Sequence, residues 1–314
     1  MGKAFFQILV FPGFLFLFIF GLVAEYVDRK LYARFQNRIG PPWFQPAADF
    51  IKLASKEEVI PEEADVATFK LMPFFALAAS CTAMLYIPLG SADAAFHFNG
   101  DVMVVLYLLT LPTLCFFLGG WYSRSIFSMI GAIRTLTQLF AYEVPLFLCL
   151  LASCLLADTW SISEAAAFYG KHPSYWFCNL LGFGVAIICL LGKLEKVPFD
   201  IPEAETEIVA GPFTEYGGRF LAVLRTALNI EMVVGSSLLT ALFLPQGLLR
   251  LRGGILFIFY LSGVFFIIAI LAFLRTLFAR LRLDQMVNLC WKYLAPLAFA
   301  QVALNLVLKG ILPR

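Results

Sequence analysis

Residues 193–219 read KLEKVPFDIPEAETEIVAGPFTEYGGR, a polar stretch between two apolar runs at 176–191 and 221–244. Pro198 and Pro202 prevent a continuous helix here, because proline removes a backbone donor and biases the preceding residue toward extended geometry. We call this stretch the acidic island. It contains six of the chain's 21 acidic residues, namely Glu195, Asp200, Glu203, Glu205, Glu207 and Glu215.

After Pro202 the sequence predicts a short helix with acidic residues at its positive end. On such a helix Glu203 and Glu207 lie one turn apart and share a face. A solvated loop would also account for these acids. Two of the predicted spanning segments, however, contain Glu143 and Glu231, and carboxylates inside a membrane are costly and mark ion paths. The island is therefore predicted to be functional.

The composition predicts an all-α polytopic membrane protein. The chain is 61% hydrophobic and 14% charged, whereas soluble domains carry roughly 25% charged residues. A net charge of +2, without a basic cluster among aromatic residues, argues against a nucleic-acid partner. The seven cysteines show no C-x-x-C spacing and are predicted to be small core residues. We therefore expect no cofactor in this chain and assign any redox centre to a partner.

Hydropathy predicts eight transmembrane helices, since each crossing needs roughly 20 apolar residues. The fourth and sixth contain charged residues and are the least regular. The predicted spans are Phe5–Ala24, Leu71–Leu89, Val102–Gly119, Leu139–Ala157, Trp176–Leu191, Leu221–Leu244, Ile255–Leu274 and Tyr293–Leu308.

The distribution of Lys and Arg predicts the orientation in the membrane. The first, third, fifth and seventh loops hold sixteen of these residues, and the opposite side holds six. The positive-inside rule then places both termini outside and the acidic island in the cytoplasm. Residues 1–314 form a single membrane domain in this interpretation, with cytoplasmic docking loops at about 25–70 and 192–220.

The first cytoplasmic loop has the pattern of an interaction surface. Phe50, Ile51 and Leu53 alternate with polar residues at helical spacing, which predicts an amphipathic helix on the membrane or under a partner. Trp43 and Phe44 lie beside prolines. A purely solvated loop has no need of these aromatic residues, so an interaction surface is favoured.

The fourth predicted span contains an acidic residue next to a proline. Glu143 precedes Val144-Pro145, and the proline leaves upstream carbonyl groups open to water or side chains. Glu143 could bond a neighbouring helix only, or it could belong to an ion path. Arg134 is nine residues earlier, in the predicted third loop, and is too far along the chain for a pair within one turn.

Four separate stretches resemble the H subunit (subunit 1) of respiratory complex I and its relatives in membrane-bound hydrogenases. They are QNRIGPPWFQPAADFIKL, GAIRTLTQLFAYEVPL, VPFDIPEAETEIVAG with TEYGG, and RLRLDQMVNLCWKYLAPL. They fall in the four predicted cytoplasmic loops, in order, so the resemblance covers nearly the whole chain. The family's eight-helix fold, with both termini outside, agrees with the hydropathy analysis.

Two departures make the chain more similar to the hydrogenase branch, which includes nickel–iron hydrogenases and formate hydrogenlyases. The first loop lacks the longer insertion typical of quinone-reducing enzymes. In addition, Leu228 stands where the complex I pattern has an acid, and this chain has Glu231 instead. Both departures argue against a working quinone site.

The resemblance implies a non-catalytic coupling subunit of an oxidoreductase complex in the prokaryotic cytoplasmic membrane. Its partners would be peripheral hydrogenase-like or quinone-reductase-like subunits and antiporter-like membrane subunits. Iron–sulfur clusters, and in the hydrogenase branch a nickel–iron site, would lie in those partners. The proton-pathway candidates are Glu143, Asp200, Glu203, Glu205, Glu207, Glu215 and Glu231. The candidates for docking the peripheral arm are Arg34, Arg38, Gly40, Pro41, Gln45, Asp49, Lys52, Arg134, Arg282 and Asp284.

Three alternatives remain open from the sequence. The chain could be the quinone-site membrane subunit of an NADH:quinone oxidoreductase. It could be a standalone ion-coupled transporter, although such proteins often contain internal repeats and none is convincing here. It could also be a structural anchor whose acidic residues are only hydrogen-bonded.

Overall fold

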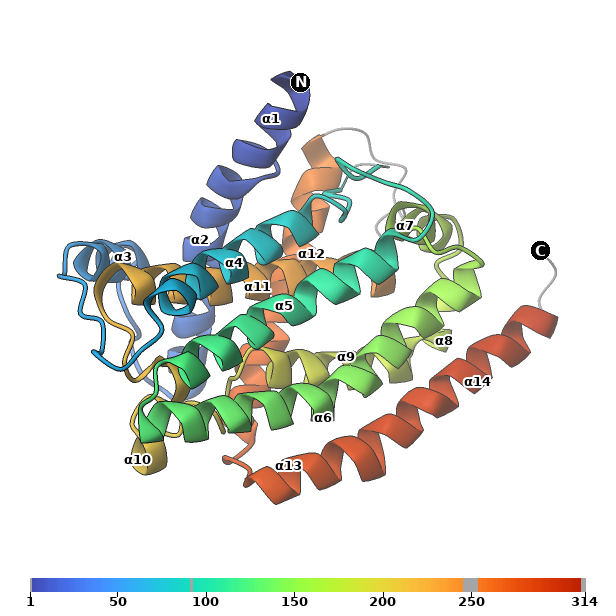
Figure 1. Cartoon of the computed structure of the whole chain (residues 1–314). Helices are drawn as coiled ribbons and strands as arrows, with labels where there is room; N and C mark the ends of the chain where they lie inside the picture. Colours follow the sequence, from blue (N-terminus) through green and yellow to red (C-terminus); the bar gives the residue numbers. More distant parts are fainter. Residues whose placement is uncertain (1, 91–92, 245–253, 312–314) are drawn as a thin grey trace.

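The structure, a computed structural model, describes residues 2–90, 93–244 and 254–311, and these ranges contain helices and no strands (Figure 1). Short helices on the loops accompany the long apolar ones. The α-helices are α1 (Gly2–Leu9), α2 (Phe14–Phe35), α3 (Gln45–Ala54), α4 (Val66–Met84), α5 (Asp101–Tyr122), α6 (Ile126–Ala157), α7 (Ile162–Lys171), α8 (Tyr175–Cys178), α9 (Leu180–Lys193), α10 (Glu205–Ile208), α11 (Gly218–Phe243), α12 (Gly254–Leu277), α13 (Leu283–Leu289) and α14 (Ala295–Ile311). A 3₁₀ turn, η1 (Gly211–Phe213), precedes α11, and a π-helical turn, η2 (Cys290–Leu294), joins α13 to α14.

Seven described segments are long and apolar enough to cross a membrane: Gly2–Phe35, Val66–Met84, Asp101–Tyr122, Ile126–Ala157, Gly218–Phe243, Gly254–Leu277 and Leu283–Gly310. This confirms an all-α polytopic membrane fold. The remaining predicted span, 176–191, consists of α8 and the 14-residue α9, which is shorter than the roughly 20 residues of a regular crossing. Eight crossings, and both termini outside, stay predictions.

Two predicted loops are largely helical. Helix α6 begins at Ile126, so Arg134 lies on the same continuous helix as Glu143 and not in a loop. Asp284 lies on α13, and the last candidate span begins at Leu283, ten residues before the predicted start. Hydropathy placed these boundaries too late because polar residues at a helix end lower the mean although they continue the backbone hydrogen bonds. The predicted amphipathic helix in the first loop is confirmed as α3.

Helix α11 lies at the centre of the bundle. It packs against α2, α4, α9 and α12, and every residue from Ile230 to Phe243 is buried. Arg225, Asn229 and Glu231 lie in its first fourteen residues, whereas the remaining part, 232–243, contains no charged residue. The central position brings these polar groups against Glu25 of α2 and against Lys193 and Glu203 of the acidic island.

The acidic island is held against α6. Gln138 donates hydrogen bonds from Nε2 to the carbonyl oxygens of Gly192 (2.7 Å) and Phe199 (2.8 Å). Gly131 approaches the island so closely that an added Cβ would lie 2.5 Å from Gly211 Cα. Only glycine permits such contact between a helix and a neighbouring backbone. The island is therefore a packed part of the fold.

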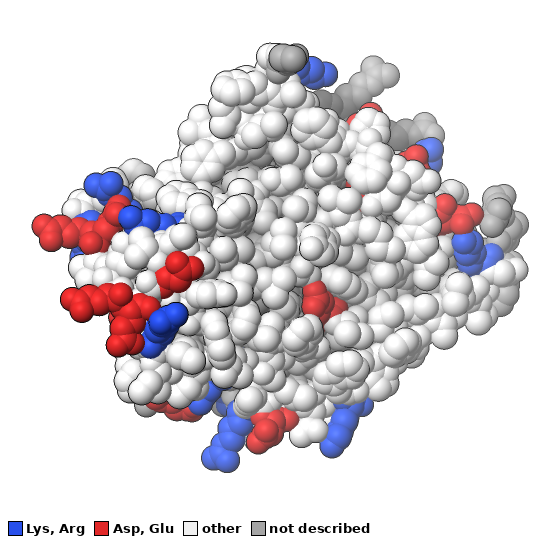
Figure 2. All heavy atoms as spheres, in the orientation of Figure 1, with Lys and Arg blue, Asp and Glu red and all other residues white. Residues whose placement is uncertain are grey.

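Charged side chains are concentrated at the ends of the bundle. In Figure 2 they gather where α3 and α10 lie and along the opposite rim, and the surface between them is uncharged except for one acidic residue. The candidate spans lie in this largely uncharged region. The distribution is the one expected of a protein whose middle faces lipid or other membrane helices.

Candidate functional site: a charge-lined cavity

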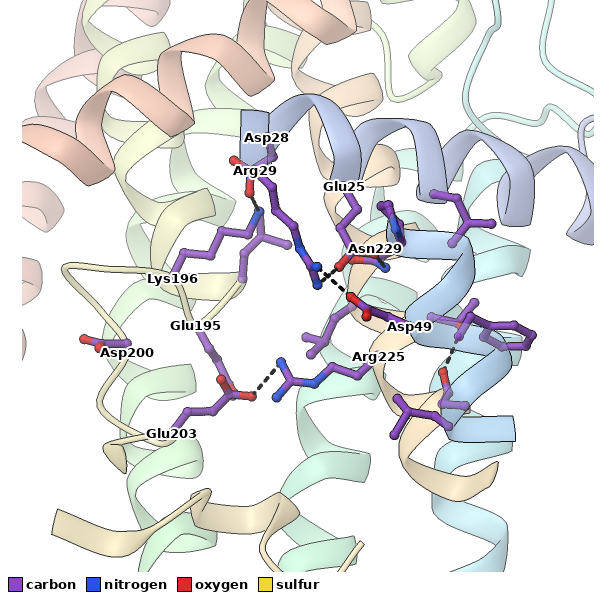
Figure 3. A pocket seen from close by; sticks show the side chains of 18 of the residues that line it. Glu25, Asp28, Arg29, Asp49, Glu195, Lys196, Asp200, Glu203, Arg225 and Asn229 are labelled. Carbon is purple, nitrogen blue, oxygen red and sulfur yellow. Dashed lines mark hydrogen bonds and ion pairs between the residues drawn. The ribbon is translucent and has the colours of Figure 1, made fainter. Parts of the chain in front are cut away.

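A cavity of about 730 Å³ lies between α2, α3, α11 and the acidic island (Figure 3). Part of its wall is apolar and includes Leu22, Phe50 and Leu53. Most of the remaining wall is charged. The acidic lining residues are Glu25, Asp28, Asp49, Glu195, Asp200 and Glu203, and the basic ones are Arg29, Lys52, Lys56, Lys196, Arg225, Arg275 and Arg280.

Asp28 on α2 anchors one side of the cavity. Its Oδ2 atom accepts from Lys196 Nζ at 2.8 Å and from Arg275 Nη1 at 2.7 Å. Arg275 also lies over the Tyr32 ring, 4.4 Å from the centroid, in a cation–π contact. Burial lowers the pKa of Lys196, and the neighbouring Asp28 opposes that shift. One buried carboxylate thus joins α2, the island and α12.

A second ion-pair group joins α2, α3 and α11. Arg29 Nη1 lies 2.9 Å from Asp49 Oδ2, and the same guanidinium pairs with Glu25. Gln45 donates to Asp49 Oδ1 at 2.8 Å, and Asn229 donates to Glu25 Oε2 at 2.5 Å. Asp49, which the sequence assigned to docking, therefore also lines the cavity, and the docking candidate Gln45 holds its carboxylate from outside the lining.

Two carboxyl groups of the island meet Arg225 of α11 (Figure 3). Glu203 Oε1 lies 3.3 Å from Arg225 Nη1. Glu195 is buried, and neither of its carboxyl oxygens has a hydrogen-bond partner among the described residues. Burial raises the pKa of Glu195 well above its usual range, and the negative charges of Glu203 and Glu231 raise it further.

A fully buried ion pair lies behind these acids. Lys193 Nζ is 2.7 Å from Glu231 Oε1, and both side chains are almost completely excluded from solvent. Lys193 also donates to the carbonyl oxygen of Leu109. Glu231 is thus an acid within the membrane fold, as the sequence predicted, and it has a cation beside it. A buried pair of this kind is held only where each charge compensates the other.

Glu143 lies beyond this pair, half-buried on α6. The positive charge of Lys193 acts on Glu143, and the negative charges of Glu231 and Glu203 act on Glu195. Successive charged groups therefore interact from α6 to the cavity. We call this set the charge row, which consists of Glu143, Lys193, Glu231, Glu195 and Glu203.

A smaller cavity of about 330 Å³ lies beside the island, between α6 and the start of α13. At its edge Arg134 Nη1 lies 2.6 Å from Glu207 Oε2, and Arg280 lies 3.9 Å from the other oxygen of Glu207. Arg280 also pairs with Asp200 at 3.5 Å. The hydrogen bond from Arg134 lowers the pKa of Glu207. Asp200, Glu207 and Arg134 thus belong to a surface ion-pair group.

The prediction that Glu203 and Glu207 share one face of a helix is wrong. Helix α10 begins at Glu205 and has four residues, and Glu203 lies in the turn before it. Glu203 faces the large cavity, whereas the side chain of Glu207 is 53% exposed. Pro202 starts a turn here and not a helix, so the two acids separate.

The other predicted residues divide between surface and interior. Glu215 is half-buried beside Tyr216, whose ring stacks on Phe69 with centroids 4.0 Å apart. Glu205 lies on α10, and its side chain is outside the described set. The remaining docking candidates lie at or near the surface of the first loop and the start of α13, and they are Arg34, Arg38, Gly40, Pro41, Lys52, Arg282 and Asp284.

Sequence reasoning did not select several residues that complete the site. Lys193 and Glu195 lie within the island but were not chosen, and Asp28, Lys196 and Arg225 were not chosen either. Asp28 contacts Lys196 across 168 positions and Arg275 across 247. A usable signal was present for Lys193, since it directly ends an apolar run that carries no other charge.

Metal ligation has no obvious location among the described residues, which contain no cluster of three or more His, Cys, Asp or Glu side chains suited to an ion. The seven cysteines are all free thiols, and five of them are buried. Their burial in the helices fits small core residues.

The helical bundle, with carboxylates inside it and a charged cavity at one end, is that of an integral membrane protein. The chain belongs to the NADH dehydrogenase family, whose profile matches residues 7–306. It is a membrane subunit of a complex-I-like complex.

Individual relatives agree with this assignment. The chain is 32% identical to the H subunit of NADH-quinone oxidoreductase from Carboxydothermus hydrogenoformans over 300 residues, covering 91% of this chain and 84% of the relative. It is 33% identical to the H subunit of the Bacillus mycoides enzyme, covering 93% and 89%. Among solved structures, a chain of the membrane-bound sulfane sulfur reductase, an archaeal respiratory membrane complex, matches with a TM-score of 0.87 and 27% identity. That match covers 97% of this chain and 100% of the other.

Proposed function

We propose that this chain is the coupling subunit of an energy-converting complex of the membrane-bound hydrogenase type. In this role it docks a peripheral redox arm and links electron transfer to proton or sodium translocation. The observation that carries the proposal is the charge row, which connects the large cavity to Glu143 on α6. Interacting carboxylates in a poorly hydrated site respond to a nearby change of charge by exchanging protons.

The cavity is the part of the molecule where a change of charge in a docked partner would be felt. It lies at the end of the bundle that carries α3 and the acidic island, where the docking residues gather. A redox group in a docked partner would act electrostatically on the charged lining of the cavity, which includes two members of the charge row, Glu203 and Glu195. Their response would reach Lys193 and Glu231, which touch each other in the interior.

The partners in this proposal carry the redox chemistry. Peripheral hydrogenase-like subunits would hold iron–sulfur clusters and a nickel–iron site, and antiporter-like subunits would move the ion. The complex would lie in a prokaryotic cytoplasmic membrane. The hydrogenase branch is supported by Leu228 and Glu231, since the acid of α11 is displaced by three positions from the complex I pattern and pairs with Lys193.

Glu143→Gln tests the coupling role. The substitution keeps the shape and much of the hydrogen bonding but removes the titratable group. We expect an assembled complex with uncoupled redox activity in detergent and a sharp fall of ion translocation in sealed vesicles. Glu164→Gln is the matched control, because Glu164 is an exposed carboxylate on α7, at the end of the bundle opposite α3 and α10 (Figure 1). Unchanged pumping per assembled Glu143→Gln complex would refute the role.

The docking role is tested separately on the first loop. Arg38 is exposed after α2, and Ile51 is 65% exposed on α3. Arg38→Glu reverses a surface charge, and Ile51→Pro breaks α3 in its last turns. Both variants should release the peripheral arm while the membrane bundle stays folded, and Lys171→Glu on α7 should not. A full-strength complex in both variants would contradict the docking role.

A quinone-reductase subunit is the second candidate, because the cavity volume of about 730 Å³ lies within the usual range of small-molecule sites. Its apolar wall at Leu22, Phe50 and Leu53 could receive a ring. Analysis of the purified complex separates the two candidates. A stoichiometric bound quinone supports the second, whereas a nickel site in the partners supports the first.

A further inference from the structure

The inner end of the cavity contains a carboxyl group that the fold leaves without a partner. Glu195 is 6% exposed, lines the cavity, and has neither carboxyl oxygen hydrogen-bonded within the described residues. An ionised carboxylate in such a place is strongly disfavoured unless a partner compensates it. A neutral carboxylic acid is tolerated much better, and it provides an O–H donor toward the cavity.

The charges around Glu195 also favour its neutral, protonated form. The groups that act on it are Glu203, Glu231, Arg225 and Lys193. Each of these cations already faces a carboxylate, since Arg225 pairs with Glu203 at 3.3 Å and Lys193 pairs with Glu231 at 2.7 Å. Two cations thus face three carboxyl groups. One bound proton brings the set to zero net charge, and the unpaired member is Glu195.

We propose that Glu195 is a proton-binding site of the cavity and that Arg225 controls its occupancy. The inference rests on the proposed coupling role and adds to it a residue outside the predicted pathway. Arg225 is half exposed and lines the same cavity, so its guanidinium has room to turn from Glu203 toward Glu195. When it does, the O–H bond of Glu195 breaks heterolytically. The proton passes to cavity water, and Arg225 neutralises the carboxylate that remains.

The proton itself can be observed by infrared spectroscopy of the purified complex. A protonated carboxylic acid has a carbonyl absorption that a carboxylate and an amide lack. At neutral pH we expect this band in the parent complex and its loss in Glu195→Gln. Glu164→Gln is the control and should keep the band. Where Glu195→Gln does not assemble, Glu195→Asp retains the acid and should show the band at a shifted position.

The charges of Glu203 and Arg225 determine the direction of two further shifts in the pH at which the Glu195 band titrates. Removing the negative charge of Glu203 stabilises the carboxylate of Glu195, so Glu203→Gln should move the titration of the band to lower pH. Removing Arg225 in the same background withdraws a positive charge, so the double variant should titrate at higher pH than Glu203→Gln alone. Equal titrations in these two variants would overturn the control by Arg225.

Reduction of the complex tests whether the proton is used. The amplitude of the Glu195 band should change on reduction in the parent and not in Glu195→Gln. An unchanged band on reduction, or an equal band amplitude at neutral pH in the parent and in Glu195→Gln, would overturn the proposal. These measurements record proton occupancy and not pumping. The coupling role, tested through Glu143, can therefore fail while the Glu195 site stands, and the reverse also holds.

Discussion

Two buried polar regions of the molecule differ in how completely their groups are paired. Near α7 and α14, the amides of Asn179, Gln301 and Asn305 bond one another, and Asn179 also donates to Tyr169. We call these four residues the amide network. Every side-chain polar atom in it has a partner, and all its members are neutral. At the other end, the charge row leaves both oxygens of Glu195 unpaired.

The amide network has the character of a structural contact, whereas the charge row has the unpaired titratable group expected of a functional site. Neutral amides joined to the backbone, such as Asn305 to Ala152 and Gln301 to Gly182, hold α14 against α6 and α9 with no group left to titrate. A fully satisfied network makes a rigid core, whereas a partly satisfied one is costly and persists where function requires it. Variants that remove each kind of group should therefore fail in different ways.

The largest expected loss of stability follows from Asp28→Asn. The substitution leaves Lys196 and Arg275 as uncompensated cations near the buried end of the cavity. Removing one partner of a buried ion pair costs about 3–5 kcal/mol. Denaturant unfolding of the purified complex in detergent measures this loss. The control is Asp158→Asn, which breaks an exposed pair with Lys309 and should cost about 0–1 kcal/mol; equal losses would remove the distinction between the two sites.

A smaller loss is expected in the amide network. Asn305→Leu removes three hydrogen bonds, to Ala152, Asn179 and Gln301, and each such bond between membrane helices contributes about 0.6 kcal/mol on average. The unfolding free energy should fall by about 2 kcal/mol in total, while pumping per assembled complex stays unchanged. Asn288→Leu, on the exposed side of α13, is the control. Loss of pumping without loss of stability in Asn305→Leu would place the network in the functional path.

Glu195→Gln should change how stability depends on pH. Because the pKa of Glu195 is raised above its ordinary value of 4.5, the folded state binds more protons than the unfolded state above that pH. The parent's stability therefore falls as pH rises from about 4.5 toward the raised value. The variant lacks this proton and should lose less stability over the same range. Thermal unfolding at several pH values measures the slope, and parallel curves would show that Glu195 is not buried as described.

The smallest effect is expected from Glu207→Gln. The side chain of Glu207 is 53% exposed in its pair with Arg134, and solvent screens such a pair. Unfolding in detergent should change by about 0.5 kcal/mol or less, and translocation should stay near the parent level. If Glu207→Gln stopped translocation as Glu143→Gln is expected to, Glu207 would belong with the charge row.

The helical membrane fold could be predicted well from the sequence, because hydropathy is a local property of residues that are consecutive along the chain. Glu143, Glu203 and Glu231 could also be selected, since their positions beside apolar runs carry the signal. The position of Glu195 between two occupied ion pairs could not be predicted, because those pairs join segments distant in the chain. The prediction that Glu203 and Glu207 share a helical face was wrong because it relied on the local pattern alone. There the local pattern favoured a helix, and the packing of the island against α6 determined the backbone.

The length of helix α6 has a mechanical consequence. Its 32 residues extend about 48 Å at about 1.5 Å per residue, which exceeds the roughly 30 Å of membrane hydrocarbon. Arg134 and Glu143 lie on the same uninterrupted rod, about 13 Å apart along its axis. A helix is stiff over that distance, so any tilt imposed on the protruding end at Arg134 displaces Glu143 with it. The fold thus contains a lever whose short arm ends beside Glu207 of the acidic island and whose long arm is the apolar part of the helix.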